Sequence, residues 1–329
     1  MRHAGASVTG LEPDADVALL FDTPSKWSLS EYPAFARADD TPDRRSFQTV
    51  YEAFSRGVVD AGLQANAVHI AQLREQTPAR FARRRPVLVA AAFTIASDVD
   101  LAWLREYAEA GGHLVLGVRT GYEDEEARAR LERKPALLDE AAGVWYDEFS
   151  NLRAPLPLEA GEGADGLSFS LTAGASGTRW ADGVQVTDEA TQVLAQYVHP
   201  HFGRWPAVTT RAAGDGRITY VGTVPDQDLA AALMEWAVRV GDGEVGEGRG
   251  AGEGRESRAA WRPATESQTV FSARNGAGER VHFLHNWSWE PSMFRLPTAV
   301  RDALSGEELA AGSELELGAW DVRVVVEAG

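Results

Sequence analysis

Histidine side chains are the first residues of this sequence that could support metal binding or catalysis. The chain has seven histidines. His199 and His201 flank a proline, and His282 and His285 stand three residues apart. A proline between two histidines indicates a turn, and a regular strand sends residues three apart to opposite faces of a sheet. Because no cysteine or adjacent acid completes a tetrahedral set, we expect no metal site and no bound cofactor.

Acidic residues are too numerous for proximity in sequence to identify a catalytic pair. The chain contains 49 aspartates and glutamates, and charge runs are typical of solvated faces. The closest groupings are Asp147-Glu148, Asp124 to Glu126, and Glu314 with Glu316. The lack of cysteine excludes disulfides and thiol nucleophiles. The nearest serine string, residues 174–177, lacks the spacing of a nucleophile elbow. We predict no catalytic residue here.

Aromatic residues offer binding surfaces. Trp27, Tyr32 and Phe35 fall in a proline-containing segment, Thr23 to Asp43, which we interpret as a long loop. A loop with exposed aromatics has the composition of an interface core, so these three residues are the candidate subunit interface. The alternative is that the loop folds back on its own domain. The string His285 to Trp289 could stack on a sugar, but aromatics at a strand end favour domain packing.

The elements that must position these residues are clearest between Asp98 and Gly121. Leu101, Leu104 and Ala108 recur with helical spacing, and a pair of glycines follows them. His113 to Val118 is then an apolar run suited to a strand that is buried on both faces. A helix that leads directly into such a strand is half of a βαβ unit, which predicts a parallel sheet.

The segments on either side extend this pattern. Helices are predicted at Ser46–Ala61, Ala71–Arg83 and Asp226–Val240, and strands at Asp16–Asp22, Gln64–Ile70 and Pro86–Phe93. This order is that of a doubly wound, flavodoxin-like α/β sheet. Between them, Pro135–Ala142 is predicted to be a short helix, Gly214-Asp215-Gly216 the turn of a hairpin, and Glu123–Arg133 a solvated helix face.

The last third of the chain differs from the preceding part in its composition and in its predicted secondary structure. Residues 241–257 are rich in glycine and charge, which predicts a flexible linker that cannot bury a core. Beyond it, Asn275-Gly276 is a hairpin signal. The strands predicted around and after this turn are Thr269–Arg274, Arg280–Asn286, Glu314–Leu317 and Val322–Val326. They indicate a small antiparallel β-sandwich domain.

The charge of the chain excludes several classes of partner. The formal net charge is −17, which argues against binding to nucleic acid or to an anionic membrane. No segment is long and apolar enough to span a membrane, and the first ten residues contain no apolar signal core. We therefore expect a cytoplasmic location and expect that the sequon Asn286-Trp287-Ser288 is unused.

Three passages resemble the C-terminal half of the family 42 glycoside hydrolases, the β-galactosidases. They are WLREYAEAGGHLVLGVRTGYEDE at residues 103–125, GDGRITYVGT at residues 214–223, and RVHFLHNWSWEP at 280–291 continuing to LELGAWDVRVVV at 315–326. The opening Met1 to Gly5 resembles the His-Ala-Gly junction that follows the catalytic barrel of that family. The resemblance covers nearly the whole chain.

The resemblance implies a trimerisation domain with a glutamine amidotransferase-like α/β fold, followed by a β-domain. In that family the hydrolytic carboxylates lie upstream in a (β/α)₈ barrel, which takes about 250 residues. The 329-residue chain is too short for such a barrel and the two domains. None of its four asparagines precedes a glutamate, as the acid/base residue of the family does. We therefore expect a non-catalytic part of a β-galactosidase, inactive alone, in carbohydrate metabolism.

The expected organisation follows the same resemblance. Residues 1–15 are a remnant of the barrel junction, 16–240 the trimerisation domain, 241–257 the linker and 258–329 the β-domain. The expected partners are two further copies of the chain in a trimer and a separately encoded barrel. Only that barrel would bind a galactoside. The alternative is a free-standing amidotransferase-like ligand-binding module or enzyme. That alternative needs functional side chains at the strand ends, where the sequence offers Asp22, Phe93-Thr94 and Arg119-Thr120.

Overall fold

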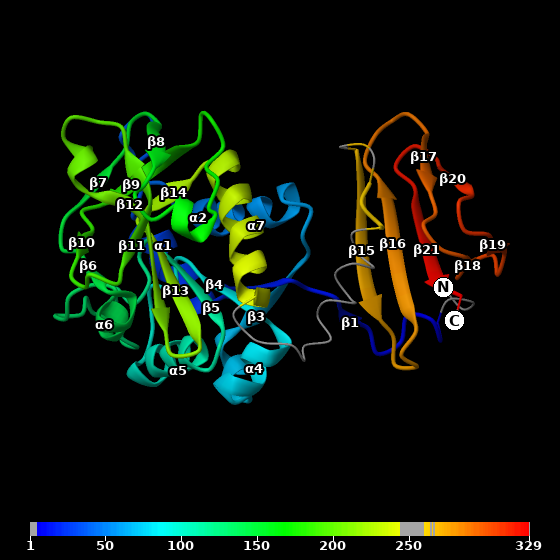
Figure 1. Ribbon diagram of the computed structural model, residues 1–329, viewed down its shortest axis with the longest axis horizontal. Coiled ribbons are helices and arrows are strands. Elements are labelled where there is room, and N and C mark those ends of the chain that lie inside the picture. Colours follow the sequence, from blue (N-terminus) through cyan, green and yellow to red (C-terminus); the bar gives the residue numbers. More distant parts are fainter. Residues whose placement is uncertain (1–4, 244–259, 264, 266, 329) are drawn as a thin grey trace. The chain divides into compact units, whose positions relative to one another are not determined.

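The structure is a computed structural model that describes residues 5–243, 260–263, 265 and 267–328 (Figure 1). The chain divides into two compact units. We call them the α/β unit, Ala15–Glu247, and the β unit, which combines Met1–Asp14 with Gly248–Gly329. The predicted linker lies outside the described residues from residue 244 onward. None of the helices in the described part of the chain could cross a membrane, because none is both long and apolar enough.

The α/β unit is built on a mixed sheet of eleven strands. Five neighbouring strands are parallel: β3 (Ala65–His69), β2 (Val17–Phe21), β4 (Val87–Ala90), β5 (His113–Gly117) and β13 (Gly216–Val221). Antiparallel pairs extend the sheet beyond β13 through β12 (Pro206–Ala213), β11 (Gln192–Tyr197), β8 (Leu156–Ala160), β9 (Ser176–Asp182) and β14 (Thr223–Pro225), with β7 (Phe149–Asn151) also paired to β9. A separate two-stranded pair joins β6 (Val144–Trp145) to β10 (Gln185–Val186).

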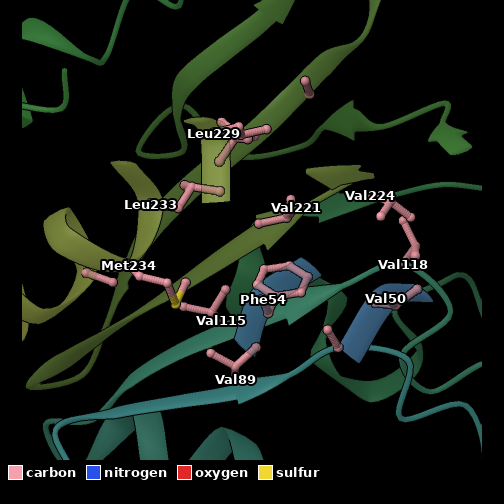
Figure 2. Close-up of a cluster of buried hydrophobic side chains, with 14 of the residues drawn as sticks. Val50, Phe54, Val89, Val115, Val118, Val221, Val224, Leu229, Leu233 and Met234 are labelled. Atoms are coloured by element: carbon pink, nitrogen blue, oxygen red, sulfur yellow. The ribbon is translucent and has the colours of Figure 1, made fainter. Parts of the chain in front are cut away.

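The central strands are buried on both faces because alternate residues enter two different cores. Val87 and Val89 of β4 belong to one core, and Leu88 between them belongs to the other. Helices α2 (Ser46–Asp60) and α7 (Gln227–Gly243) contribute to the first core, and α4 (Pro78–Arg84) and α5 (Asp98–Glu109) to the second. Figure 2 shows the first core, where Phe54, Leu233 and Met234 surround the strand residues. Because both faces of these central strands are buried, their sequences are continuous apolar runs.

Helices α2 and α7 approach closely at Gly57. A Cβ added to Gly57 would lie 2.6 Å from the Cβ of Ala230 and 2.7 Å from its carbonyl carbon. Real Cβ atoms do not come this close to backbone, so a larger residue would force the two helices apart. Glycine at this position is therefore a packing requirement of the first core.

Most predicted elements of the α/β unit are confirmed. Helix α5 begins at Asp98 behind a Ser97 cap whose Oγ accepts the Asp100 amide at 3.2 Å, and β5 follows after Gly111 at φ +97°. Helix α2, the Gly214–Gly216 hairpin and α7 also form. The short helix predicted between β3 and β4 is two helices, α3 (Ile70–Arg74) and α4. The helix before Gly143 consists of a 3₁₀ turn (Ala136–Leu138) and α6 (Asp139–Ala142).

The predicted loop at Thr23 to Asp43 is partly wrong, because α1 (Thr23–Glu31) is a helix. Asp22 caps it, and its Oδ2 accepts the backbone N–H of Ser25 at 2.8 Å. Pro24 lies in the first turn, where the missing N–H has no partner to lose and the fixed φ suits the helix. Pro24 therefore marks the start of the helix, whereas the prolines of this segment had indicated a loop from the sequence.

The predicted helix at Glu123–Arg133 is also wrong, because this segment consists of bridges and turns. Glu123 pairs with Ile95 and with Ala129 in isolated β-bridges. The Asp124 carboxylate accepts the backbone N–H groups of Glu126 and Arg128, each at 3.0 Å. Aspartate that bonds to nearby backbone in this way competes with the helix, so the charged run folds as a turn.

The β unit contains a six-stranded antiparallel sheet and a separate hairpin. The sheet order is β1 (Glu12–Pro13), β15 (Gln268–Arg274), β16 (Arg280–Asn286), β21 (Val322–Glu327), β18 (Val300–Asp302) and β19 (Glu308–Leu309). The hairpin joins β17 (Ser292–Arg295) to β20 (Glu314–Leu317). A core containing Trp261, Leu284, Phe294 and Val325 includes residues of both. The predicted Asn275-Gly276 hairpin is confirmed as the β15–β16 connection. Strand β1 was not predicted.

Candidate functional site

The surface of α1 carries two of the three residues predicted as a subunit interface. Ser28 and Leu29 are buried beneath the helix, which leaves Trp27 directed outward with 66% of its surface exposed. Tyr32 ends the helix and is 76% exposed. We call Trp27 and Tyr32 the α1 surface. It is an unusual exposure for two large aromatic side chains, and such exposure marks interaction sites when it is contiguous.

The third predicted interface residue, Phe35, belongs to the core of its own unit. Only 2% of its surface is exposed, and its ring centroid lies 5.6 Å from that of Trp180. The Asn151 side chain bonds to the backbone on both sides of Phe35, at Ala34 and Ala36. The alternative of a segment that folds back on its own domain therefore describes this residue, because Trp180 and Asn151 lie more than a hundred positions away in sequence.

Most residues that the sequence analysis named at strand ends make structural interactions, but the buried Thr94 hydroxyl has no hydrogen-bond partner among the described residues. Asp22 caps α1, and its Oδ1 lies 3.9 Å from Nε2 of His69. Phe93 is buried in the second core. The Thr120 hydroxyl donates to the carbonyl oxygens of Ala90 and Gly117. Asp22, Phe93 and Thr120 each fix the chain where a strand becomes a loop.

Arg119 and Glu123 form a buried ion pair at the end of β5. Their Nη2 and Oε1 atoms are 3.8 Å apart, and the two residues are 9% and 7% exposed. The Arg119 guanidinium also lies 3.5 Å from the centre of the Tyr122 ring, and Glu123 accepts a 2.7 Å hydrogen bond from Ser28. Arg119 has a left-handed φ of +65°. Sequence reasoning missed Glu123 and Ser28 because it assigned Glu123 to a solvated helix.

Asp182 is the carboxyl group most perturbed by its surroundings. It is fully buried at the end of β9, where Oδ1 accepts the Trp180 indole N–H at 2.7 Å and Oδ2 accepts the Tyr220 hydroxyl at 2.7 Å. Burial raises the pKa of Asp182 to about 7. A carboxyl that titrates near neutrality is typical of active sites. Because none of its surface is exposed, this group cannot meet a substrate.

Two of the described histidines are buried, one in each unit. His113 is buried between Thr219 and the Ala237 carbonyl, and burial lowers its pKa to about 3, so that the ring is neutral. His282 is buried in the β unit, with Nε2 3.1 Å from Oε1 of Glu327. Burial lowers the pKa of His282 as well. Among the residues that the structure describes, no group of three or more His, Cys, Asp or Glu side chains could hold a metal ion.

The His285–Trp289 string ends at an exposed surface. Trp287 and Trp289 are 50% and 80% exposed, so packing does not cover their rings in the described structure. Asn286, which precedes Trp287, is 1% exposed, and its amide donates to the carbonyl oxygens of Glu290 and Gly318. An amide engaged in this way is not accessible to a glycosyltransferase. Exposed aromatic side chains are therefore accessible for binding, whereas Asp182, His113 and His282 are buried.

Comparison with known proteins identifies the α/β unit. The sequence profile of the β-galactosidase trimerisation domain matches residues 15–240. A β-galactosidase of Halorubrum lacusprofundi is 31% identical over 226 residues, which cover 67% of this chain and 30% of that protein. A β-galactosidase of Alicyclobacillus acidocaldarius is 26% identical over 326 residues, or 97% of this chain and 42% of that protein. The chain thus spans less than half the length of these curated relatives.

Solved structures show the same fold over nearly the whole chain. The β-galactosidase of Bacillus circulans superposes with a TM-score of 0.75 at 17% identity, covering 99% of this chain and 43% of that one. The β-galactosidase of Rahnella sp. R3 gives a TM-score of 0.73 at 18% identity, covering 96% and 41%. By the profile match to its larger part, the chain belongs to the trimerisation-domain family of the glycoside hydrolase family 42 β-galactosidases, and it matches their non-catalytic middle and C-terminal portion.

Proposed function

We propose that this chain is the oligomerisation and support portion of a β-galactosidase-like glycoside hydrolase, and that it assembles as a trimer through the α/β unit. The profile match to a trimerisation domain over residues 15–240 carries this proposal. The α/β unit also supports a glutamine amidotransferase-like fold, because five parallel strands form one half of its sheet and helices contribute to the cores on both faces.

The α1 surface is the proposed contact between subunits. A large aromatic side chain buries about 150–250 Å² when it is fully covered, and each Å² of apolar area contributes about 25 cal/mol. Because 66% of the Trp27 surface is exposed and available to a partner, covering it stabilises a trimer by roughly 2–4 kcal/mol. Exposed ion pairs near the helix, Arg44 with Glu31 and Arg45 with Glu52, supply the polar rim that such interfaces have. Phe35 is excluded from the contact by its burial.

We further propose the domain limits 16–240 and 258–329, joined by a linker at 241–257 and preceded by a junction at residues 1–15. In this arrangement the barrel with the two catalytic carboxylates is a separate partner. A galactoside binds to that barrel and not to this chain. The support is the burial of two carboxyl groups: Asp182 is inaccessible and Glu123 is paired with Arg119. Neither can act as one of the two exposed carboxyls that glycoside hydrolysis needs.

The assembly is tested by light scattering of the purified chain at micromolar concentration. We expect three times the chain mass of 35.5 kDa for the native protein. Trp27→Ala should shift the population toward the monomer, and Tyr32→Ala should do so to a smaller extent. Trp289→Ala is the matched control, since it removes a similarly exposed indole from the β unit. A native monomer, unchanged by Trp27→Ala, would refute the proposal.

The lack of independent activity is tested with a nitrophenyl β-galactoside. We expect no turnover above a mock purification from cells that carry an empty vector. Turnover that is lost on changing one acidic residue of this chain would contradict the proposal. Turnover that survives every such change would instead identify a contaminating enzyme, because a substitution in this chain cannot affect it.

A further inference from the structure

Three tryptophans of the β unit form an exposed group that the proposed assembly does not use. Trp287, Trp289 and Trp320 are 50%, 80% and 51% exposed, whereas only one other of the ten tryptophans of the chain, Trp27, is exposed. The ring centroids of Trp287 and Trp320 are 6.1 Å apart, and those of Trp289 and Trp320 are 5.6 Å apart. We call these three residues the tryptophan cluster. Contiguous exposed aromatics of this kind mark a binding surface.

The cluster stands on two loops that are fastened to each other. One loop connects β16 to β17 and carries Trp287 and Trp289, and the other connects β20 to β21 and carries Trp320. The buried amide of Asn286 donates to backbone oxygens of both loops, at Glu290 (2.8 Å) and at Gly318 (2.9 Å). The Trp320 amide also donates to the Ser288 carbonyl at 3.0 Å. The spacing of the three rings is therefore set by the backbone before any ligand arrives.

Trp287 is the fixed ring of the cluster. Its indole N–H donates to the Thr269 hydroxyl at 2.8 Å, and the His285 ring stacks on it at 5.2 Å with an angle of 8° between the planes. Trp320 meets Trp287 nearly at a right angle, 85°, and Trp289 meets Trp320 at 69°. The cluster thus presents aromatic planes that form corners, unlike the flat apolar face that a packed sheet would need.

Trp320 is held in a backbone conformation that its side chain disfavours. Its φ is +53°, in the left-handed region where bulky residues are rare. The turn is stabilised by Asp321, whose carboxylate accepts the amides of Gly318 and Val322. Strain of this kind persists where the surrounding structure imposes it, and it is concentrated at functional positions. A glycine would satisfy the same turn, so the indole is there for a reason other than folding.

We propose that the tryptophan cluster is a binding surface for a neutral carbohydrate. The C–H groups of a pyranose ring form an apolar face that packs on an indole, and its hydroxyls need hydrogen-bond acceptors at the margin. The exposed Glu290, next to Trp289, supplies such an acceptor. The charge of −17 opposes anionic ligands such as nucleic acids and acidic lipids but leaves an uncharged sugar unaffected. The site shares no residue with the α1 surface and does not depend on the assembly.

Affinity electrophoresis of the intact chain tests this proposal, with native gels that contain galactan, xylan or hydroxyethylcellulose and a gel without polysaccharide. We expect at least one polysaccharide to retard the native chain. Trp289→Ala should weaken the retardation at least tenfold, expressed as the polysaccharide concentration that halves the mobility. Trp320→Gly should weaken it to a similar extent while the thermal midpoint stays equal or rises, because glycine relieves the left-handed backbone. Trp27→Ala is the matched control and should bind like the native chain.

Three results would overturn the proposal. The first is equal mobility in all gels, and the second is retardation that neither cluster variant changes. The third is a change of oligomeric state caused by Trp289→Ala, which would assign the cluster to a protein contact. Loss of the trimer in Trp27→Ala with unchanged retardation would support the carbohydrate site, and it would distinguish that site from the subunit contact.

Discussion

The two units of this protein use their tryptophans in opposite ways. In the α/β unit, Trp103, Trp180, Trp205 and Trp236 are buried and only Trp27 is exposed beyond a third of its surface. In the β unit, Trp261 is buried and the other three are exposed. A sheet covered on two faces offers large cores that bury such side chains, whereas the β unit has a single main core. Most tryptophans of the α/β unit therefore pack in its cores, whereas most of those of the β unit lie on its surface. Replacing a tryptophan by alanine should thus affect stability in the α/β unit more than in the β unit.

The largest contrast is expected from Trp236→Ala in the α/β unit. Trp236 is 2% exposed, donates its indole N–H to the Leu167 carbonyl at 3.0 Å and packs against His113 and Phe169. Truncating a buried aromatic residue leaves a cavity, and we expect the free energy of unfolding to fall by about 3–5 kcal/mol. Urea denaturation measures it. A fall in the free energy of unfolding of less than about 1 kcal/mol would show that the core tolerates the cavity. It would also remove the contrast between the tryptophans of the two units.

In the α/β unit, Asp182 should also make the stability depend on pH. The pKa of Asp182 is about 7 in the folded protein, above the ordinary value of 3.8. Between these values the folded chain holds a proton that the unfolded chain has lost, so the free energy of unfolding falls as pH rises from about 4 to 7, by up to roughly 4 kcal/mol. Asp182→Asn should remove this part of the decline. Parallel denaturation profiles of native and variant protein across that range would contradict it.

Two glycine substitutions compare the cost of a steric clash in the α/β unit with the cost of a strained backbone in the β unit. Gly57→Ala places a methyl group against the backbone of Ala230 in α7, which should cost about 3 kcal/mol, the upper end of the range for overpacking. The helix propensity gain of about 1 kcal/mol leaves a net loss of about 2 kcal/mol. In the β unit, Gly278 has open space but a φ of +83°. Gly278→Ala should therefore cost only the backbone strain, on the order of 1 kcal/mol. Thermal denaturation should show a larger fall in the thermal midpoint for Gly57→Ala than for Gly278→Ala. Equal falls would contradict this order.

The smallest effect on stability is expected from Trp289→Ala. Its ring is 80% exposed and contacts Trp320, so its removal should change the free energy of unfolding by no more than about 0.5 kcal/mol. Chemical denaturation beside Trp236→Ala gives the comparison directly. A loss as large as that of Trp236→Ala would mean that the indole is a packing residue, and the distinction between the units would fail.

Local patterns predicted many of the helices and strands of both units, because these elements depend on residues close in sequence. Helix α5 and strand β5 follow from periodicity and a glycine pair, and the β15–β16 hairpin follows from Asn275-Gly276. Pro24 was misinterpreted because proline both breaks a helix and begins one, and only the Asp22 cap decides between them. Glu123 was misplaced because charge alone does not distinguish a helix from an Asp-stabilised turn.

Long-range partners explain what the sequence could not predict. Phe35 is buried because β9 brings Trp180 against it, and the pKa of Asp182 is raised because residues distant in sequence bury its carboxyl group completely. The string His285–Trp289 drew attention to one loop, but its third indole, Trp320, comes from a turn some thirty positions later. The angle between these rings depends on the Asn286 amide, whose acceptors no periodicity reveals.

Strand β1 has a consequence for the order in which the chain folds during synthesis. Glu12 pairs with Arg274 and Pro13 with Ala273, so the edge of the β unit joins a segment made before the α/β unit to one made after it. The intervening α/β unit can complete its sheet while the ribosome is still working, since domains fold as units. The early segment must wait for β15 to emerge. A shortened variant without β1 would leave β15 as an open edge, the kind of strand that recruits other chains into aggregates.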